Sequence, residues 1–178
     1  RDLGKTSGGM GSMSQKHFDF WPVGLPRNIT APATNVFYNV EVSAARFPDK
    51  PYVIFFEAPL SFSRFKDEAE RLAGYLQNDL GVQAGDRVLL VMQNSPQFIL
   101  SYYGILRANA IVVRVNPMSV TAELEHYVED SSARIALIAQ EVYPQLQPLM
   151  DKQRDKQLQH AVVAAYRDYI DAKADLRM

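Results

Sequence analysis

The stretch that decides the fold is Gly81–Pro117, GVQAGDRVLLVMQNSPQFILSYYGILRANAIVVRVNP. An apolar run, Arg87–Met92, follows a glycine-containing turn, and a second, β-branched run, Ala110–Val115, closes the stretch. Between them, Asn94-Ser95-Pro96 offers a helix cap followed by proline at the first helical position, and apolar residues then recur at helical spacing. The stretch therefore predicts a strand, a helix and a second strand. Strands that are apolar on both faces are typical of a parallel sheet with helices on both sides.

The same pattern continues on either side of this stretch. Strands are expected to begin near Arg87, Ala110, Arg134 and Leu158, and helices are expected at 95–107, 122–130 and 142–152. Upstream, Thr34 and Ser63 are expected to cap two further helices, and residues 52–56 and 60–62, joined by Glu57-Ala58-Pro59, are expected to form a hairpin. The repetition predicts a doubly wound, mostly parallel α/β sheet with helices on both faces, preceded by an extended aromatic arm and a short hairpin.

The two ends of the chain depart from this pattern. Residues 1–14 carry four glycines and no periodicity, so we interpret them as an expression tag or disordered linker and place the protein proper at 15–178. The segment Phe18–Pro32 combines three aromatic residues with three prolines. It predicts an extended, non-helical arm whose aromatic side chains pin it to the main body. Residues 167–178 are compatible with a helix.

Composition excludes several classes of function. The chain has 178 residues, 47% of them hydrophobic, which suffices for one domain that buries about 70% of its unfolded surface. Its formal net charge is −1, with acidic and basic residues scattered, so a nucleic-acid partner is not expected. Cysteine is absent, which excludes disulfides and thiolate chemistry and is compatible with a reducing cytoplasm. No run approaches the roughly 18 apolar residues of a membrane span.

The carboxyl ends of the predicted strands are the first places to look for a ligand site, because open parallel sheets bind ligands there. Asn94-Ser95 and Asn116–Ser119 lie at two such ends. Backbone N–H groups at the helix starts that follow could hold an anion. Asn94, Ser95 and Thr121 are also ordinary helix-capping residues, and we favour that structural interpretation because capping alone explains these residue types.

Other motifs give no evidence of a site. No G-x-G-x-x-G follows a strand, no G-x-x-x-x-G-K-[ST] occurs, and no G-x-S-x-G marks a nucleophile. The segment Lys5–Gly9 resembles a phosphate loop only superficially, because no strand precedes it. The histidines His17, His126 and His160 are far apart and have no second ligand at zinc spacing, so no metal site is predicted.

The adjacent pair Asp86-Arg87 invites a catalytic interpretation, but its position argues for structure. Asp86 suits the turn that leaves Gly85, and Arg87 can keep its charged head in water at the start of a buried strand. This is the amino end of the sheet, opposite the usual ligand end. We therefore predict no catalytic residue in this chain and leave its cofactor-binding residues unassigned.

A series of short motifs, in order and spacing, carries a family resemblance. The main ones are Gly85-Asp86-Arg87-Val88, Gln93-Asn94-Ser95, Val115-Asn116-Pro117 and Asp130-Ser131, with Phe18–Pro22 and Ala44–Pro51 upstream. They resemble the N-terminal part of AMP-forming acyl-CoA synthetases of the adenylate-forming superfamily, and the upstream segments resemble fatty-acyl-CoA ligases in particular. Two residues depart from the family pattern: Arg64 stands where an acidic residue is frequent, and Asn109 stands where glycine is frequent. Asparagine tolerates the left-handed backbone that glycine would supply.

The resemblance implies a two-step reaction. ATP and a carboxylic acid, expected to be a fatty acid, give an acyl-adenylate, and coenzyme A then forms the thioester; Mg²⁺ would neutralise phosphate charge. The family's Ser/Thr/Gly-rich nucleotide loop, its ribose-binding Asp and its late catalytic Lys lie downstream of the region present here. We therefore expect an N-terminal fragment, truncated before that loop, with no cofactor of its own. Its partner would be the missing C-terminal catalytic portion, and the fragment alone would be inactive.

Two other interpretations stay open. The chain could be a stand-alone α/β small-molecule-binding or interaction module without catalysis, or a nucleotide-binding regulatory domain of flavodoxin-like type. A reading frame that continues past Met178 favours the ligase fragment, and a stop codon there favours the stand-alone module. Nucleotide or flavin binding by the isolated chain favours the flavodoxin-like regulatory domain. In a fragment, surfaces such as Ser101-Tyr102-Tyr103 and the aromatic arm would be exposed, so a homodimer is possible.

Overall fold

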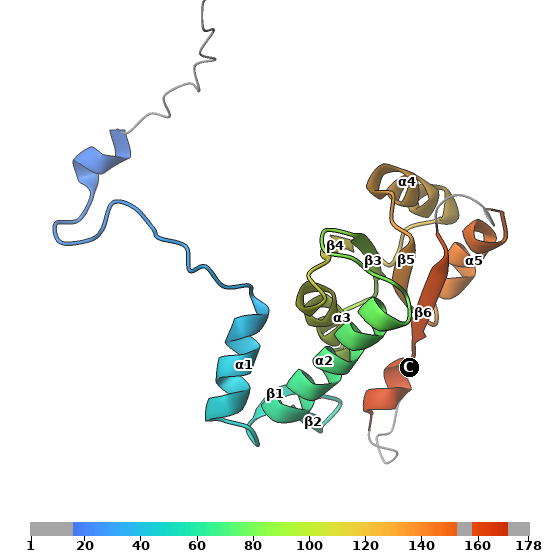
Figure 1. The fold of residues 1–178 in the computed structure, drawn as a ribbon, viewed down its shortest axis with the longest axis horizontal. Coiled ribbons are helices and arrows are strands. Elements are labelled where there is room, and N and C mark those ends of the chain that lie inside the picture. Colours follow the sequence, from blue (N-terminus) through green and yellow to red (C-terminus); the bar gives the residue numbers. More distant parts are fainter. Residues whose placement is uncertain (1–15, 153–157, 171–178) are drawn as a thin grey trace, which may run out of the picture. The chain divides into compact units, whose positions relative to one another are not determined.

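The computed structural model of the protein describes residues 16–152 and 158–170 (Figure 1). The chain divides into two compact units, residues 1–33 and 34–178, and each is described by itself. The predicted tag at 1–14, including Lys5–Gly9, lies outside the described residues.

The first unit contains one short 3-10 helix, η1 (Lys16–Phe20). Its aromatic rings pack locally: the Phe18 centroid lies 4.2 Å from that of His17 and 5.6 Å from that of Trp21. The Trp21 N–H also donates to the Phe18 carbonyl, 3.3 Å away. The expectation of a non-helical arm is therefore corrected at residues 18–20, where this local hydrogen bond turns the chain. That the aromatics pin the arm to the main body stays a prediction.

The second unit is built on a four-stranded parallel sheet with the order β4-β3-β5-β6. Its strands are β3 (Arg87–Val91), β4 (Ile111–Arg114), β5 (Ile135–Ala139) and β6 (His160–Ala164). All three neighbouring pairs are parallel, and Leu89 of β3 lies between Val113 and Ala136 in register. The parallel sheet predicted from the sequence is confirmed.

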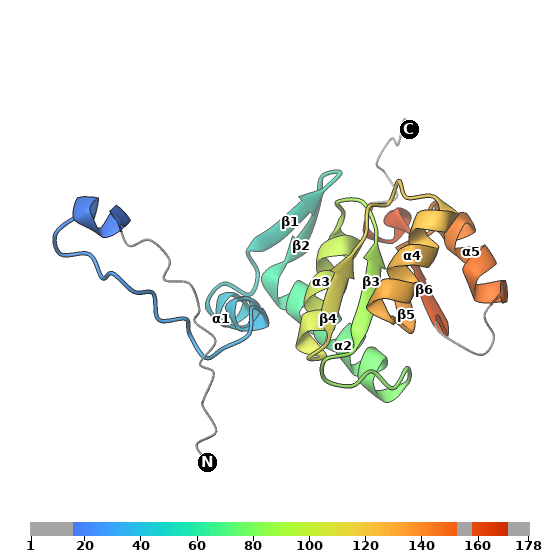
Figure 2. The ribbon, with the colours of Figure 1, turned by 90° about the horizontal axis from the view of Figure 1, so that it is seen from above.

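Helices cover both faces of the sheet. They are α2 (Phe62–Asn78), α3 (Pro96–Arg107), α4 (Thr121–Ser131) and α5 (Tyr143–Lys152). Helix α1 (Phe37–Arg46) packs against α2 and α3, and a 3-10 helix, η2 (Tyr166–Tyr169), follows β6. The two views show α2 and α3 on one side of the sheet and α4 and α5 on the other (Figure 1, Figure 2). This follows from right-handed crossovers, because the direction of strand addition reverses after β4. The helix expected at 167–178 is η2 where it is described, and 171–178 lie outside the described residues.

A hairpin of β1 (Pro51–Phe55) and β2 (Ala58–Ser61) precedes α2, as predicted. Its turn is Phe56-Glu57, and not the expected Glu57-Ala58-Pro59. Both turn residues have positive φ, 45° and 64°, which is the pattern of a two-residue type I′ turn. Asparagine and glycine are the usual residues there, so the antiparallel pairing of the strands imposes this conformation on an unfavourable sequence.

Two helices begin with a serine cap. Ser95 caps α3 as predicted, since its Oγ accepts from the Phe98 N–H at 3.1 Å. The cap of α2 is Ser61, whose Oγ accepts from the Arg64 N–H at 3.3 Å, and not the expected Ser63. The helix starts two residues earlier than its apolar stripe indicates, because β2 runs directly into it.

The caps predicted at Thr34 and Thr121 are wrong. Val36 and Val120 hold those positions in α1 and α4, and neither makes a side-chain cap. At α4 the bond runs the other way, because the Val120 N–H donates to the Glu123 carboxylate at 3.2 Å. A first-turn carboxylate can thus replace a capping side chain at a helix start.

The core has two clusters. The larger lies around β3 and β5, where Val88–Val91 and Ala136–Ala139 are each at most 1% exposed. The smaller joins α1, α2 and the hairpin through Phe37, Leu60 and Phe65. Helices α2 and α3 pack closely, and a Cβ added at Gly104 would lie 2.8 Å from the Leu72 Cδ2. Because β3 and β5 are buried in the core, the residues that follow them are held in fixed positions.

Candidate functional site

The strand order defines where a ligand site is expected. From β3 the chain adds β4 on one side, and then returns past β3 to add β5 and β6 on the other. In such a sheet, a crevice forms at the carboxyl ends of the two strands where this reversal occurs, here β3 and β5. The residues that follow these two strands are therefore the first to consider.

The crevice between the ends of β3 and β5 is filled by Tyr166 of η2. Its hydroxyl accepts from the Gln93 N–H at 3.2 Å. Gln93 follows β3, Tyr166 follows β6, and β5 lies between these two strands, so the side chain reaches past the end of β5 to the end of β3. Burial first, and then the influence of the Glu141 carboxylate, raise the pKa of Tyr166 to about 12. The protein's own tyrosine thus occupies the place where this topology usually holds a ligand.

A hollow of about 550 Å³ opens next to this point, at the carboxyl ends of β3 and β4. Asn94, Arg114, Asn116 and Met118 are among its lining residues, none of which is acidic. The Arg114 guanidinium carbon lies 5.6 Å from the centre of the Phe98 ring. The hollow therefore combines amides with one aromatic-supported cation.

The polar residues predicted at these strand ends mostly support backbone turns. The Asn116 Oδ1 accepts from the Met118 N–H at 3.0 Å, and the Asn116 carbonyl accepts from the Ser119 N–H at 3.0 Å. Ser95 is 4% exposed and caps α3. Of the three residues interpreted as helix caps, Asn94, Ser95 and Thr121, only Ser95 is confirmed as one. Asn94 is exposed and makes no side-chain hydrogen bond to any residue within 16–152 or 158–170.

A second cavity, of about 250 Å³, lies between α2, α3 and the last two strands. We call it the β6 groove and define it by Leu72, Leu100, Leu137, Val162 and Ala164, with Gln97 and Ser101 as its uncharged polar residues from α3 and Glu68 and Asp168 as its charged ones. Gln97 is 5% exposed and its Nε2 donates to the Ala165 carbonyl at 2.6 Å. Its Oε1 is buried and has no partner among the described residues.

Sequence reasoning missed both Gln97 and Tyr166. Gln97 is a polar residue in the first turn of α3, where a solvent-facing side chain is the usual expectation. The partners lie far along the chain, at separations of 68 residues for Gln97 with Ala165 and 73 residues for Tyr166 with Gln93. No local pattern reports such pairs. A buried polar residue inside an apolar helix stripe would have been the only available signal.

The amino end of the sheet holds the Asp86-Arg87 pair. The Asp86 Oδ2 accepts from the Gln83 N–H and from the Arg134 guanidinium, both at 2.9 Å. The Gln83 bond first, and then Arg134, lower the pKa of Asp86. The turn role predicted for Asp86 is confirmed, and Arg87 is exposed as expected. Only a small cavity of about 50 Å³ adjoins the pair.

The histidines do not assemble into a site. His126 and His160 are exposed, and His17 stacks on Phe18 in the first unit. Across residues 16–152 and 158–170, no three His, Cys, Asp or Glu side chains gather as metal ligands. That this chain binds no metal stays a prediction. In the same described ranges, every helix is too short or too polar to cross a bilayer.

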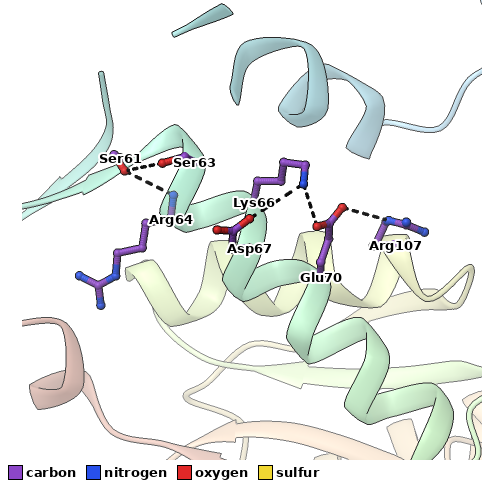
Figure 3. Close-up of polar contacts among 7 residues, drawn as sticks. All are labelled: Ser61, Ser63, Arg64, Lys66, Asp67, Glu70 and Arg107. Carbon is purple, nitrogen blue, oxygen red and sulfur yellow. Dashed lines mark hydrogen bonds and ion pairs between the residues drawn. The ribbon is translucent and has the colours of Figure 1, made fainter. Parts of the chain in front are cut away.

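A charged network runs along α2 (Figure 3). The Lys66 Nζ lies 2.8 Å from the Glu70 Oε2, and the Glu70 Oε1 lies 3.9 Å from the Arg107 Nε, which links α2 to α3. Arg64, which departs from the family pattern, pairs with Glu68 at 2.7 Å. These are exposed or half-exposed ion pairs, each worth at most about 1 kcal/mol. Arg64 stands where the family often has an acidic residue, and here it is held in an ion pair with Glu68.

The fold matches solved acyl-CoA ligases. An anthranilate CoA ligase, solved with anthranoyl-AMP, superimposes with a TM-score of 0.70 and 25% identity over 79% of this chain and 27% of that one. A long-chain-fatty-acid-CoA ligase from Archaeoglobus fulgidus gives a TM-score of 0.70 and 24% identity over 81% and 30%. The N-terminal domain of FACL13 from Mycobacterium tuberculosis gives 0.65 and 22% over 73% and 33%. The fold is that of the N-terminal region of adenylate-forming ligases.

Sequence comparison identifies the family. The family model for AMP-binding enzymes matches residues 40–176. The long-chain-fatty-acid–CoA ligase of Bacillus subtilis (strain 168) is 36% identical over 124 residues, which cover 70% of this chain and 22% of the ligase. That of Escherichia coli O6:H1 is 35% identical over 130 residues, which cover 73% and 23%. The chain belongs to the AMP-binding enzyme family and spans less than a quarter of these curated relatives. The resemblance found in the sequence is confirmed.

Proposed function

We propose that this chain is the N-terminal portion of a longer ATP-dependent ligase that joins a carboxylic acid, expected to be a long-chain fatty acid, to coenzyme A through an acyl-adenylate. Residues 15–178 would form its N-terminal subdomain, truncated before the nucleotide loop. The observation that carries the proposal is the family match over residues 40–176, together with relatives of which the chain covers 22% and 23%. The sheet would supply the scaffold against which the rest of the ligase packs.

The described residues do not fit ATP or Mg²⁺ as a complete site. Tyr166 fills the switch-point crevice, and the neighbouring hollow offers one cation, Arg114. No three acidic or histidine side chains converge anywhere in 16–152 or 158–170. A triphosphate with its metal needs several cations or N–H donors around it. The proposal therefore assigns ATP, Mg²⁺ and coenzyme A to the longer protein and expects the 178-residue chain to be inactive.

The test compares two lengths of the same protein. The full reading frame and the 178-residue chain are expressed and purified, and each is incubated with ATP, Mg²⁺, coenzyme A and fatty acids of graded length. We expect acyl-CoA and pyrophosphate from the longer protein only. Thioester formation by the short chain would contradict its inactivity. A longer protein that makes no acyl-adenylate with any carboxylic acid would contradict the ligase assignment.

The position of Tyr166 argues against the flavodoxin-like alternative. Its nucleotide or flavin would need the crevice between the ends of β3 and β5, where the Tyr166 hydroxyl already accepts from the Gln93 N–H. Calorimetry of the short chain with nucleotides and flavins tests this, and we expect no heat of binding. A stop codon after Met178 would instead favour the stand-alone module.

Assembly and location are further parts of the proposal. Of the segment expected to drive a homodimer, only Tyr102 is exposed, at 36%, whereas Ser101 is 5% exposed and the Tyr103 ring packs 5.6 Å from that of Phe65. This weakens the case for self-association through that segment, because two of its three side chains face the core. Light scattering at increasing concentration tests the homodimer, and cell fractionation tests the cytoplasmic location.

A further inference from the structure

The β6 groove has the composition of a contact surface between parts of a protein. Its floor is apolar, because Leu137 of β5 and Val162 of β6 are register partners and face the same side. Leu72 of α2 and Leu100 of α3 form its walls. Within the described residues, β6 pairs with β5 alone, so the sheet has no further strand beyond it. The result is a hollow of about 250 Å³ that an apolar side chain could fill.

Gln97 adds a specific requirement to this surface. The Ala165 carbonyl can only accept, so the Gln97 amide nitrogen must face it, and the Oε1 is left for a donor from elsewhere. The side chain is 5% exposed, and a buried acceptor without a partner is destabilising. Rotating the amide to free the oxygen would break the 2.6 Å bond to Ala165. The groove therefore needs an N–H or O–H donor next to an apolar group.

The rim of the groove decides between kinds of occupant. Its charged lining residues are Glu68 and Asp168, with no lysine, arginine or histidine. Glu68 is engaged by Arg64 and by the Tyr169 hydroxyl, whereas Asp168 is exposed. Because Arg64 compensates Glu68, the rim has one uncompensated charge, the Asp168 carboxylate, which disfavours a fatty-acid carboxylate or a nucleotide phosphate beside it. The groove therefore calls for an occupant that is apolar, carries a hydrogen-bond donor and has no negative charge. A polypeptide segment meets these three requirements, because it brings apolar side chains together with neutral backbone N–H groups.

We propose that the β6 groove is the contact surface for the rest of the same ligase: a segment of the longer polypeptide seats an apolar side chain between Leu72, Leu100 and Val162 and donates a hydrogen bond to the Gln97 Oε1. This inference rests on the proposed function. Most of a longer ligase would be available to fill the groove, because the chain covers only 22% and 23% of relatives that are single longer polypeptides. Packing of this kind buries the groove and satisfies Gln97 in one step.

The test uses a thiol placed in the groove. The chain has no cysteine, so Val162→Cys introduces a single, nearly isosteric thiol on the groove floor. Gln83→Cys, in the exposed loop at the amino end of β3, is the internal reference in the same molecule. Alkylation of each site is followed by peptide mass spectrometry in the 178-residue chain and in the full reading frame. In the longer protein, we expect alkylation at 162 to slow by about tenfold or more relative to 83, because reaction then requires local opening.

The outcomes separate the two proposals. If the longer protein makes acyl-CoA but residue 162 reacts as fast as in the short chain, the groove is free and this inference alone is wrong. If the longer protein is no ligase yet 162 is protected, the proposed function fails and the contact stands. Concentration-dependent protection in the short chain would make a second copy the occupant and would overturn the inference.

Gln97→Met provides a second, independent measurement. In the short chain it removes the bond to Ala165, and in the longer protein it also removes the proposed acceptor. We expect the fall in melting temperature to be larger in the longer protein than in the short chain. Equal falls would contradict the donor to Gln97 even if the groove proved to be covered.

Discussion

The two ends of the parallel sheet are built from the same strands but are satisfied to different degrees. At the amino end, Asp86 accepts from Gln83 and Arg134, and a cavity of about 50 Å³ adjoins it. At the carboxyl end, a hollow of about 550 Å³ lies open and the Gln97 Oε1 has no partner within the described ranges. Tyr166 closes one point of that end and leaves the rest accessible.

The difference indicates that further contacts are to be expected at the carboxyl end of the sheet. At the amino end, the Asp86 carboxylate bonds to Gln83 and Arg134, which lie in the loops that lead into β3 and β5. At the carboxyl end, caps and turns are satisfied, but the space between the elements is not filled. Parallel sheets use this end for function, and here the proposed ligase would complete it with the rest of its chain.

Shortening a buried side chain of β3, the strand that runs between the two ends, should cause the largest loss of stability. Leu90 lies in β3 and is fully buried, so Leu90→Ala is expected to destabilise the chain by about 2 to 5 kcal/mol. Met118→Ala is the control, because Met118 is 82% exposed and should change stability by no more than about 0.5 kcal/mol. Urea unfolding followed by circular dichroism measures both. A loss below about 1 kcal/mol for Leu90→Ala would contradict the central position of β3.

Breaking the amino-end contact should cost less. Asp86→Ala removes two charge-assisted hydrogen bonds in a partly exposed site, and we expect a loss of about 2 kcal/mol. The pKa of Asp86 is lowered in the folded state, so its contribution is present above the unfolded pKa, near 4, and is lost as the pH falls through the lower folded pKa. Asp86→Asn should therefore unfold with a weaker pH dependence below pH 4. An unchanged acid transition would show that another carboxyl group dominates.

Opening the switch point is the corresponding change at the carboxyl end. Tyr166→Phe leaves the Gln93 N–H without its acceptor, at an expected cost of about 1.5 kcal/mol. Tyr102→Phe is the control on the exposed side of α3. Because the folded pKa of Tyr166 is about 12, its contribution is complete below the unfolded pKa of about 10 and is lost as the pH rises through 12.

Absorbance at 295 nm checks this assignment. The late alkaline step should shrink in Tyr166→Phe and persist in Tyr102→Phe. A titration in Tyr166→Phe that matches the unmodified chain would place the high pKa on other tyrosines and would weaken the account of the closed crevice.

Removing a cap at the carboxyl end should have the smallest effect. Ser95→Ala leaves the Phe98 N–H unpaired, and we expect a loss of about 1 kcal/mol. Ser63→Ala is the matched control, because Ser61 and not Ser63 caps α2. Thermal unfolding of the two variants compares them directly. A larger loss for Ser63→Ala would restore the original assignment of that cap.

Most elements of the sheet were predictable because their signals are local. The apolar runs beginning at Arg87 and near Ala110, and the cap and proline at Ser95-Pro96, mark β3, β4 and the start of α3 within a residue or two. Asn109 has φ 60°, the left-handed backbone expected where the family often uses glycine. Each of these features depends on residues within one turn or one strand of each other.

Features that depend on neighbouring elements were predicted less well. The hairpin turn at Phe56-Glu57 carries no turn signal, because the pairing of β1 with β2 forces it. The cap of α2 moved to Ser61 because β2 ends there. Both depend on where an adjacent element stops, and sequence periodicity locates such boundaries only to within a few residues.

For this protein, the order of apolar runs, caps and turns was enough to establish a parallel α/β fold and its family, because period and turn chemistry are properties of short segments. The tertiary structure alone decided that Tyr166 closes the crevice between β3 and β5, and that Gln97 is buried with one free acceptor. These pairs join residues about 70 positions apart, and their contact exists only after β6 has packed beside β5. The functional surface therefore follows from the assembled sheet.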